Sequence, residues 1–598
     1  MTLINANSTQ PRRLTTIPFP RHVPVQATGA AGPCHATDRG ATLKVVAAAT
    51  RQAGEVIVLT GPDSTPAGLP PAAPVPAGPA PAEPGPRREH GLPAEPVLAL
   101  PWALLAAVAG GLALTAAFPP VAVWPLAPLG PALLVLALQG RGLRASVLAG
   151  LLFGLALFVP LLSWLINVAW YAWAALAVAE AVIFALLCAG QRVLLSLRAW
   201  PVAVAGWWVA AEALRGRWPY AFPWGRLAMS QAGTPAAPWA AVGGAPLLTF
   251  LLALTGSTLA WLVLRRRIVP ALAFAGALGL TLAGAVLPVD PVPPGTPAAT
   301  VAAVQGDVPH ARNLPNLLRA TTVTQNHAAA TERLAAQVKA GLKPAPDVVI
   351  WPENATDLDP RFYPPVFGTI AAAVRAIGRP VLVGEVLEDP QRNVGQLWTP
   401  AHGPGPLYVK RQLVPFGEYI PFRGLLSHIT SLVALQPHNF TAGRRPVVFH
   451  VGRIRLGDVI CYEVGFDGLV SSEVRAGANL LTVQTNDATF EVDGQRGESL
   501  QQLAMARIRA VETDRAVVVA STTGVSAIIA PDGTLVAHTG TWQRAVLESR
   551  VPLLNTTTLA IRLGGWPEFL ITALTLAAFA WAVSRRAVAA RRRPSAPA

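Results

Sequence analysis

The sequence predicts a membrane protein of about eight transmembrane helices, with one α/β domain inserted between the seventh helix and the eighth. Two patterns predict this fold: long apolar runs before residue 290 and again near 565–584, and alternating strand-like and helix-like segments between them. Composition agrees, because 52% of the 598 residues are hydrophobic and only 13% are charged. A soluble domain carries about 25% charged residues, so much of this chain is expected to lie in lipid.

Each apolar run is about as long as a bilayer core requires, roughly 20 residues in a helix. The runs lie at 97–117, 120–139, 145–167, 170–190, 200–214, 240–264, 268–288 and 565–584. The fifth run is the shortest. We therefore divide the chain into a tail (1–95), a seven-helix membrane domain (96–290), an inserted domain (299–555), a final transmembrane helix (563–585) and a basic tail (586–598).

The N-terminal tail, residues 1–95, is rich in proline, alanine and glycine. Such a segment buries too little apolar surface to offset the entropy lost on ordering, so we expect disorder. No apolar run follows a basic start, so we do not expect a secretory signal peptide.

Arginines predict the orientation, because cytoplasmic loops are enriched in Lys and Arg. With the tail in the cytoplasm, the arginines of four turns and tails fall on that side: Arg141, Arg144, Arg192, Arg198, Arg265 to Arg267, Arg585, Arg586 and Arg591 to Arg593. The inserted domain is then extracytoplasmic. One outer loop departs from the rule, with Arg215, Arg217 and Arg226. Arg215 and Arg226, with Trp218 and Trp224, either contact phospholipid headgroups or belong to a structural loop between helices.

The net charge of +15 does not indicate nucleic-acid binding. Arginines gather at the ends of apolar runs, and no helix-turn-helix, zinc or RNA-binding motif accompanies them. The three cysteines, Cys34, Cys188 and Cys461, fall in a polar tail, an apolar run and the inserted domain. These environments differ, so we expect no disulfide, and Cys461 is predicted to be a free thiol.

The inserted domain alternates strand and helix patterns, which favours a layered α/β domain with its site at strand ends. The expected strands are 300–305, 347–351, 380–384, a hairpin within 447–460, 479–484 and 516–520. The expected helices are about 316–340, 365–377 and 497–513. The apolar segment 425–435 is either a core helix or a mobile lid near the membrane.

Three residues at or near expected strand ends carry the chemistry: Glu353 in Trp-Pro-Glu, Lys410 before Pro-Phe-Gly-Glu, and Cys461 in Cys-Tyr-Glu. Taken singly, each residue also fits a role without catalysis: Glu353 as a solvated turn carboxylate, Lys410 as a surface amine and Cys461 as a buried thiol. Together they suit acyl transfer through a thioester. A carboxylate moves the proton, a thiolate attacks the carbonyl, and an ammonium stabilises the oxyanion. Such a centre beside a bilayer suggests that the acyl group comes from a lipid, and it needs no metal or organic cofactor.

The motifs resemble those of the nitrilase (carbon–nitrogen hydrolase) superfamily. With membrane helices on both sides of the insert, the chain resembles the bacterial apolipoprotein N-acyltransferase family. The matching stretches are 351–353, 413–419, 460–463, 485–488, 506–512 and 523–526. The resemblance implies an αββα sandwich with Glu353 as general base, Lys410 as oxyanion stabiliser and Cys461 as nucleophile. It also implies three auxiliary residues: Glu418 orients Lys410, Tyr462 offers a backbone N–H to the oxyanion, and Glu463 shapes the pocket. Asn354 and Thr489 depart from the Thr and Trp of many relatives, so the resemblance does not define the residues of the acceptor pocket.

The resemblance also implies a function. The enzyme would take an acyl chain from a phospholipid and pass it to the N-terminal amine of a diacylglyceryl-cysteine lipoprotein, at the outer face of a bacterial inner membrane. Two alternatives stay open at this point. One is a membrane-bound amidase that hydrolyses its thioester, and the other is an inactive membrane binding or transport protein.

Overall fold

The computed structural model describes residues 95–287, 292–309, 315–428, 433, 438–491 and 496–591. The predicted disorder of the N-terminal tail, Cys34 and most of the segment 425–435 fall outside these residues. Of that segment, the structure describes the end of a short helix, α10 (Arg423–Leu426), and the turn that follows it.

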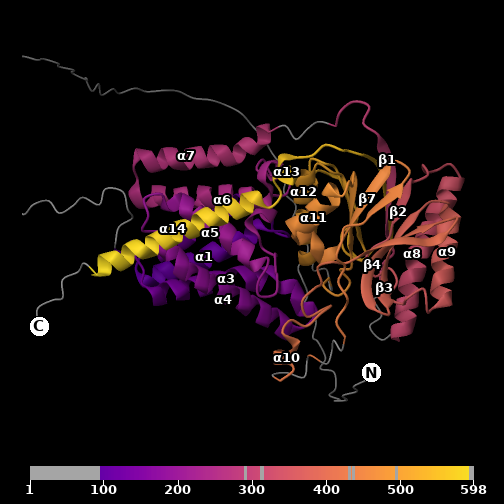
Figure 1. Ribbon diagram of the computed structural model, residues 1–598, viewed down its shortest axis with the longest axis horizontal. Helices are drawn as coiled ribbons and strands as arrows, with labels where there is room; N and C mark the ends of the chain where they lie inside the picture. The colour runs from indigo at the N-terminus through magenta and orange to yellow at the C-terminus, as the bar shows by residue number, and fades with distance from the viewer. Residues whose placement is uncertain are drawn as a thin grey trace, which may run out of the picture. The chain divides into compact units, whose positions relative to one another are not determined.

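Apolar helices form a bundle from the first half of the described chain and its C-terminal helix (Figure 1). They are α1 (Leu100–Ala117), α2 (Leu129–Leu138), α3 (Leu143–Leu161), α4 (Trp170–Leu194), α5 (Trp200–Arg215), α6 (Trp239–Arg265), α7 (Ile268–Leu282) and α14 (Trp566–Arg591). Among the described residues, six helices are long and apolar enough to cross a membrane: α1, α3, α4, α6, α7 with its 3-10 extension, and α14. The protein is therefore a membrane protein. The number of crossings stays a prediction, because α2 has 10 residues and α5 has 16.

The predicted span 120–139 is wrong as a single helix. It divides into a 3-10 turn, η1 (Trp124–Leu126), and the short helix α2. Four prolines, Pro119, Pro120, Pro125 and Pro128, lie in or next to its first half. Proline lacks the N–H that an interior helical position must donate, so a continuous helix cannot form there.

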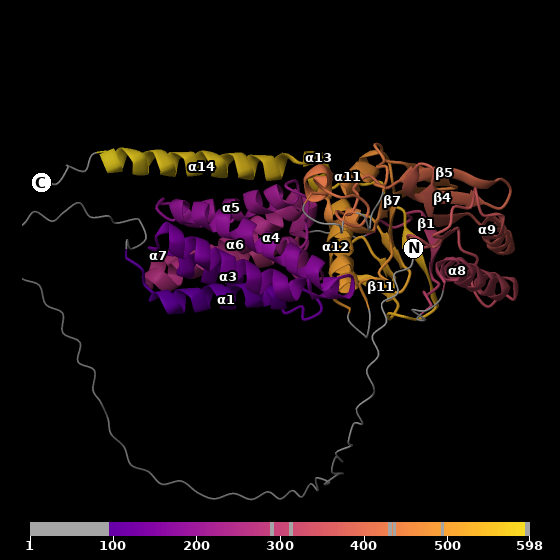
Figure 2. The same cartoon turned by 90° about the horizontal axis from the view of Figure 1, so that it is seen from below.

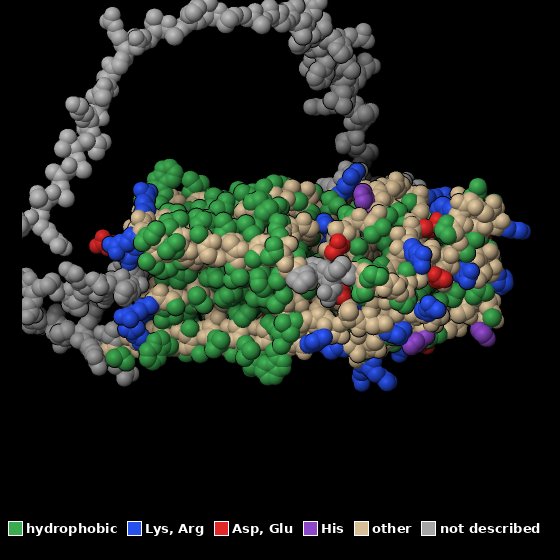
Figure 3. All heavy atoms as spheres, turned by 90° about the horizontal axis from the view of Figure 1, so that it is seen from above, with side chains coloured by type: hydrophobic (Ala, Val, Ile, Leu, Met, Phe, Trp, Pro, Cys, Tyr) green, Lys and Arg blue, Asp and Glu red, His purple; other side chains and the backbone are tan. Residues whose placement is uncertain are grey.

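Hydrophobic side chains cover the bundle over most of the face in Figure 3, with Lys and Arg side chains gathered at one end. Trp102, Leu186 and Leu574 are 63%, 66% and 71% exposed, as expected for side chains that face lipid. At one end of the bundle, Arg586 Nη2 donates to the backbone carbonyl of Arg192 at 3.2 Å. Two of the predicted cytoplasmic basic segments therefore lie together.

The inserted domain holds two six-stranded sheets. In the first, the order is β12 (Ala545–Pro552), β1 (Ala298–Gln305), β2 (Val348–Ile350), β3 (Val381–Glu388), β4 (Gln391–Thr399) and β5 (Gly403–Val409). In the second, the order is β11 (Leu535–His538), β10 (Ala527–Ile529), β9 (Val517–Ser521), β8 (Leu480–Thr485), β7 (Ile454–Ile460) and β6 (Val448–Val451). Strands β1, β2 and β3 are parallel to one another, and so are β7, β8 and β9. Their carboxyl ends therefore meet at shared sheet edges.

The two sheets pack face to face, and helices cover both outer faces (Figures 1 and 2). The core between the sheets joins apolar side chains of both, such as Val301 and Ile350 with Leu456 and Val518. Outside the first sheet lie α8 (Asn316–Lys339) and α9 (Pro364–Ile377); outside the second lie α11 (Asp467–Arg475) and α12 (Gly497–Thr513). The αββα sandwich is thus confirmed.

Helix α12 is buried on two sides, because it packs against β9 of the second sheet and against α6 of the bundle. Trp164 and Trp224 of the membrane domain both donate their indole N–H groups to Gln501 Oε1, at 3.3 and 2.8 Å. A short helix, α13 (Leu559–Leu563), then leads into α14.

Candidate active site

The predicted glutamate and lysine meet in an ion-paired cluster. Glu353 follows β2 and Lys410 follows β5. Lys410 Nζ donates to Glu353 Oε1 at 2.9 Å and to Glu418 Oε1 at 3.0 Å. Lys410 is 1% exposed and Glu353 is 5% exposed, so the charges are held away from bulk water. The sequence therefore identified this pair and its second carboxylate correctly as neighbours.

Further donors fix both carboxylates. Asn393 Nδ2 on β4 donates to Glu353 Oε1 at 2.6 Å and to Glu418 Oε1 at 2.9 Å. The backbone N–H of Asn486 donates to Glu353 Oε2 at 3.0 Å, and that of Val414 donates to Glu418 Oε2 at 2.8 Å. Buried charges are tolerated when they are paired and hydrogen-bonded in this way.

Cys461 ends β7 and begins a 3-10 turn, η6 (Cys461–Gly465). Its φ is +52°, in the left-handed region that non-glycine residues seldom adopt. Such a conformation costs about 1–3 kcal/mol and persists where the surroundings impose it. Gln502 Nε2 on α12 lies 3.6 Å from Cys461 Sγ, and the charges of Glu353 and Lys410 both act on that thiol.

Glu463 holds this turn against the segment that carries the lysine. Its carboxylate accepts the backbone N–H groups of Ile460 at 2.8 Å, Arg411 at 2.6 Å and Gln412 at 2.9 Å. It also accepts the hydroxyl of Tyr408, on β5, at 2.8 Å. Glu463 therefore joins the end of β7 to the chain beside Lys410, and so links the two sheets at the site.

Burial sets the protonation states. Burial raises the pKa of the Cys461 thiol well above its usual value; the charge of Glu353 adds to this and Lys410 opposes it. Burial also raises the pKa of Glu353, against the lowering effect of Lys410. For Lys410 burial acts downward, but Glu353 and Glu418 together raise its pKa well above 10.5. At neutral pH the cluster therefore holds an ammonium and a protonated thiol, which needs a base at the moment of attack.

Tyr462 connects η6, the turn that begins with Cys461, to the membrane domain. Its hydroxyl donates to the carbonyl of Ala221 at 2.6 Å. Its ring stacks on Phe222 and Trp224, with centroids 6.4 and 5.9 Å apart. The loop that departs from the positive-inside pattern thus contacts the residue next to Cys461.

Two of the three arginines that depart from the positive-inside pattern, Arg215 and Arg226, are structural. Arg215 and Arg226 are 2% and 6% exposed, and Trp224 is 2% exposed. Arg215 pairs with Glu180 of α4. The headgroup interpretation is therefore wrong for these three side chains, because their polar groups are bonded inside the protein. Trp218 differs, being 61% exposed.

Comparison with known proteins identifies the family. A family model for the apolipoprotein N-acyltransferase N-terminal domain matches residues 110–258, and one for carbon-nitrogen hydrolase matches residues 300–560. An apolipoprotein N-acyltransferase of Mycolicibacterium smegmatis is 37% identical over 77% of this chain and 82% of its own length. The chain belongs to the apolipoprotein N-acyltransferase family. It is an acyltransferase with a carbon–nitrogen hydrolase domain.

A second apolipoprotein N-acyltransferase, of Azotobacter vinelandii, is 32% identical over 81% of this chain and 95% of its own length. Among solved structures, a cysteine-to-alanine mutant of the Nesterenkonia AN1 amidase, from the nitrilase superfamily, matches with a TM-score of 0.33 and 17% identity. That match covers 46% of this chain and 96% of the amidase.

Sequence reasoning did not predict two side chains of this candidate site, Asn393 and Gln502. Asn393 lies on β4, which was not expected as a strand, and only its two carboxylate partners reveal its place. Gln502 lies on the expected helix 497–513, but a helical pattern does not show which face meets a cysteine 41 positions away. Residues 391–398 begin with three consecutive polar residues and lack the polar–apolar alternation of a half-buried strand, so the sequence carried little signal for β4.

An ion network connects η6, the turn that begins with Cys461, to the helical bundle. Arg226 donates to Asp467 Oδ1 at 2.7 Å and Oδ2 at 3.0 Å, and Arg509 Nη2 lies 2.6 Å from Asp467 Oδ1. Arg509 also donates to the carbonyls of Val464 at 2.8 Å and Gly465 at 3.1 Å, inside η6. The matching stretch 506–512 thus has a structural role, since its Arg509 holds the turn that begins with Cys461.

Replacing Asp467 by asparagine is expected to lower stability by about 1.5–3 kcal/mol, because two buried arginines lose charge-assisted hydrogen bonds to a shared carboxylate while Glu212 and Glu512 stay beside them. Thermal unfolding of the full chain in detergent measures this, with the exposed Asp389→Asn as matched control. An unfolding temperature for Asp467→Asn equal to that of the control contradicts the account.

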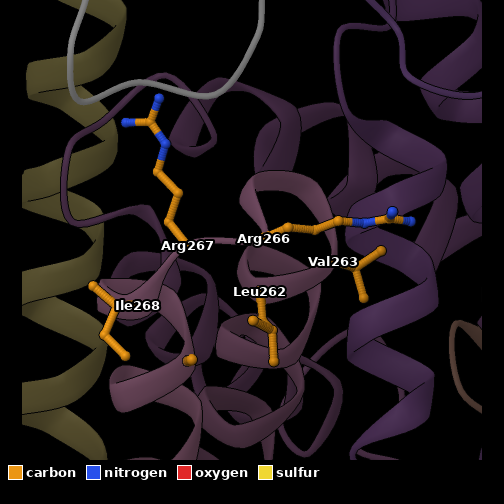
Figure 4. A pocket seen from close by; sticks show the side chains of 6 residues that line it. Leu262, Val263, Arg266, Arg267 and Ile268 are labelled. Carbon is orange, nitrogen blue, oxygen red and sulfur yellow. The ribbon is translucent and has the colours of Figure 1, made fainter. Parts of the chain in front are cut away.

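A pocket of about 540 Å³ lies away from this site, at the α6–α7 turn. Its Arg266 and Arg267 side chains point in different directions, so they do not converge on one anion (Figure 4). Its lining carries no carboxylate, thiol or hydroxyl. In the described part of the chain, no three His, Cys, Asp or Glu side chains group as a metal site.

Proposed function

We propose that this enzyme N-acylates lipoproteins: it moves an acyl chain from a phospholipid to the α-amine of a diacylglyceryl-cysteine. One observation supports the proposal most. A buried carboxylate–ammonium pair acts on a cysteine whose neighbour, Tyr462, stacks on a loop of the membrane domain. This arrangement supports thioester chemistry next to the apolar helices.

In the first step, Glu353 takes the proton of Cys461 as the sulfur attacks the ester carbonyl of the phospholipid. Lys410 and the backbone N–H of Tyr462 stabilise the oxyanion, a kind of contact whose loss costs about 10²–10³ in rate. The C–O bond then breaks, and Glu353 returns the proton to the alkoxide. The products are an acyl thioester on Cys461 and a lysophospholipid.

In the second step, the neutral amine of the acceptor attacks the thioester carbonyl and loses a proton to Glu353. The C–S bond breaks, the sulfur regains that proton, and an amide leaves. Glu418 acts by orienting Lys410, and Glu463 acts by holding the nucleophile turn beside it. Thiol, carboxylate and ammonium suffice for both steps, so no metal or organic cofactor enters.

We propose that the protein lies in the bacterial inner membrane, with domain 299–555 on the extracytoplasmic side and the tails 1–95 and 586–598 in the cytoplasm. The basic turns and tails at one end of the bundle support this orientation. An impermeant maleimide should label an Arg333→Cys variant in intact spheroplasts and leave the parent protein unlabelled. Labelling that requires lysis contradicts the placement.

The amidase alternative differs in the fate of the thioester. Given phospholipid and a diacylglyceryl-cysteinyl peptide, the purified enzyme is expected to release lysophospholipid and acylated peptide in equal amounts, with ping-pong kinetics. Mass spectrometry of both products measures this ratio. Free fatty acid without acylated peptide would instead establish a hydrolase, and no product at all would favour an inactive module.

A further inference from the structure

A pocket of about 490 Å³ lies beside the catalytic cluster and has no part in the steps above. Helix α8 and the segments after β2, β8 and β9 enclose it. Its polar walls are Asn316, Arg319, Asn354, Asp357, Asn486, Thr489 and Thr522. Apolar side chains line another part. They are Leu317, Ala320 and Leu358, together with Val308, Val323 and Ala488, which pack against one another.

The pocket adjoins the base rather than the nucleophile turn. Asn354 directly follows Glu353, and the N–H of Asn486 donates to the Glu353 carboxylate. Thr522 fixes the other wall, since its hydroxyl donates to Asn486 Oδ1 at 2.8 Å. The membrane domain contacts both sides of the site, through Tyr462 at the turn of Cys461 and through Phe490, the residue after Thr489. A ligand in this pocket would therefore lie beside the group that accepts the amine's proton.

The wall chemistry favours a peptide over an acyl chain. Asn354 Oδ1 is buried and accepts no hydrogen bond from the described residues. Asp357 and Arg319 are exposed at the pocket, and the charges of Arg319 and Glu353 both reach Asp357. The exposed Asp357 carboxylate and Arg319 guanidinium thus offer an acceptor and donors to one space, as a polypeptide backbone with its alternating N–H and C=O groups requires. Buried polar groups without partners would disfavour a hydrocarbon.

We propose that this pocket binds the polypeptide segment that follows the modified cysteine of the acceptor. Binding there places the α-amine next to Glu353, so that attack on the thioester becomes effectively intramolecular. This inference rests on the proposed function. Asn354 and Thr489 both line this pocket.

The two half-reactions test the proposal separately. Thioester formation is followed by intact mass with phospholipid alone, and transfer by single turnover with two acceptors: a diacylglyceryl-cysteine amide, and the same group extended by a short peptide. For the parent protein, the extended acceptor is expected to reach half-maximal transfer at roughly tenfold lower concentration, about 1.4 kcal/mol of added binding.

Arg319→Ala and Asp357→Asn should abolish that advantage while thioester forms at the parent rate, and Arg333→Ala, an exposed arginine on the same helix, should keep it. Equal use of both acceptors by the parent overturns the inference. So does an advantage that survives in both pocket variants, or a loss confined to thioester formation. Absence of any thioester in the parent overturns the proposed function itself, and the inference with it.

Discussion

Replacing Lys410 by methionine is expected to reduce acyl transfer by at least about 10²–10³-fold, because the oxyanion loses its ammonium. Methionine matches much of the stem but carries no charge. Glu353 and Glu418 would then face each other through Asn393 without a counter-ion, in a site where Lys410 is 1% exposed. Breaking a buried pair in this way costs about 3–5 kcal/mol, so the unfolding temperature should also fall.

Lys339→Met is the matched control, since Lys339 is exposed on α8. Transfer rate and thermal unfolding in detergent are compared for the two variants. If Lys410→Met keeps more than a tenth of the parent rate, the ammonium is not the oxyanion stabiliser.

Replacing Glu353 by glutamine is expected to stop thioester formation and to remove the acidic limb of the pH–rate profile. Burial raises the pKa of Glu353, and the base works only when deprotonated, so the parent rate should rise with pH through that raised pKa. Burial also holds the pKa of Cys461 well above 9, so the thiol does not ionise first. The acidic limb therefore belongs to the glutamate.

The rate of Cys461 acylation, measured from pH 4 to 9 at fixed phospholipid, checks this prediction, with the exposed Glu332→Gln as control. If the Glu353→Gln variant is acylated on Cys461 at the parent rate, the general base is a group other than Glu353. The same conclusion follows if the variant reacts slowly but its pH–rate profile keeps the acidic limb of the parent.

The positions of Glu353 and Cys461 could be predicted from the sequence because each closely follows a short strand. Val348–Ile350 is wholly apolar, and Ile454–Ile460 ends in the apolar residues Val459 and Ile460. Val348–Ile350 and Ile454–Ile460 show the buried runs typical of parallel strands. Lys410 was harder to place. It follows β5, whose sequence begins Gly-Pro-Gly-Pro and lies at the edge of its sheet, where few residues of high strand propensity are required.

Side-chain partners far apart in sequence could not be predicted. Arg215 and Arg226 fit an exposed basic loop until their partners, Glu180 and Asp467, are known. Asp467 lies 241 positions from Arg226, and neither hydropathy nor periodicity encodes that pairing. Asn393 is comparable, because its position depends on two carboxylates that belong to other segments.

The central claim is that Cys461 carries the acyl group between donor and acceptor. Purified protein mixed with phospholipid alone, then digested and analysed by mass spectrometry, tests it directly. The account predicts an acyl adduct on the peptide that contains Cys461, removed by hydroxylamine and absent from Cys461→Ala. A Cys461 peptide that stays unmodified while acylated acceptor accumulates in a parallel reaction would contradict it.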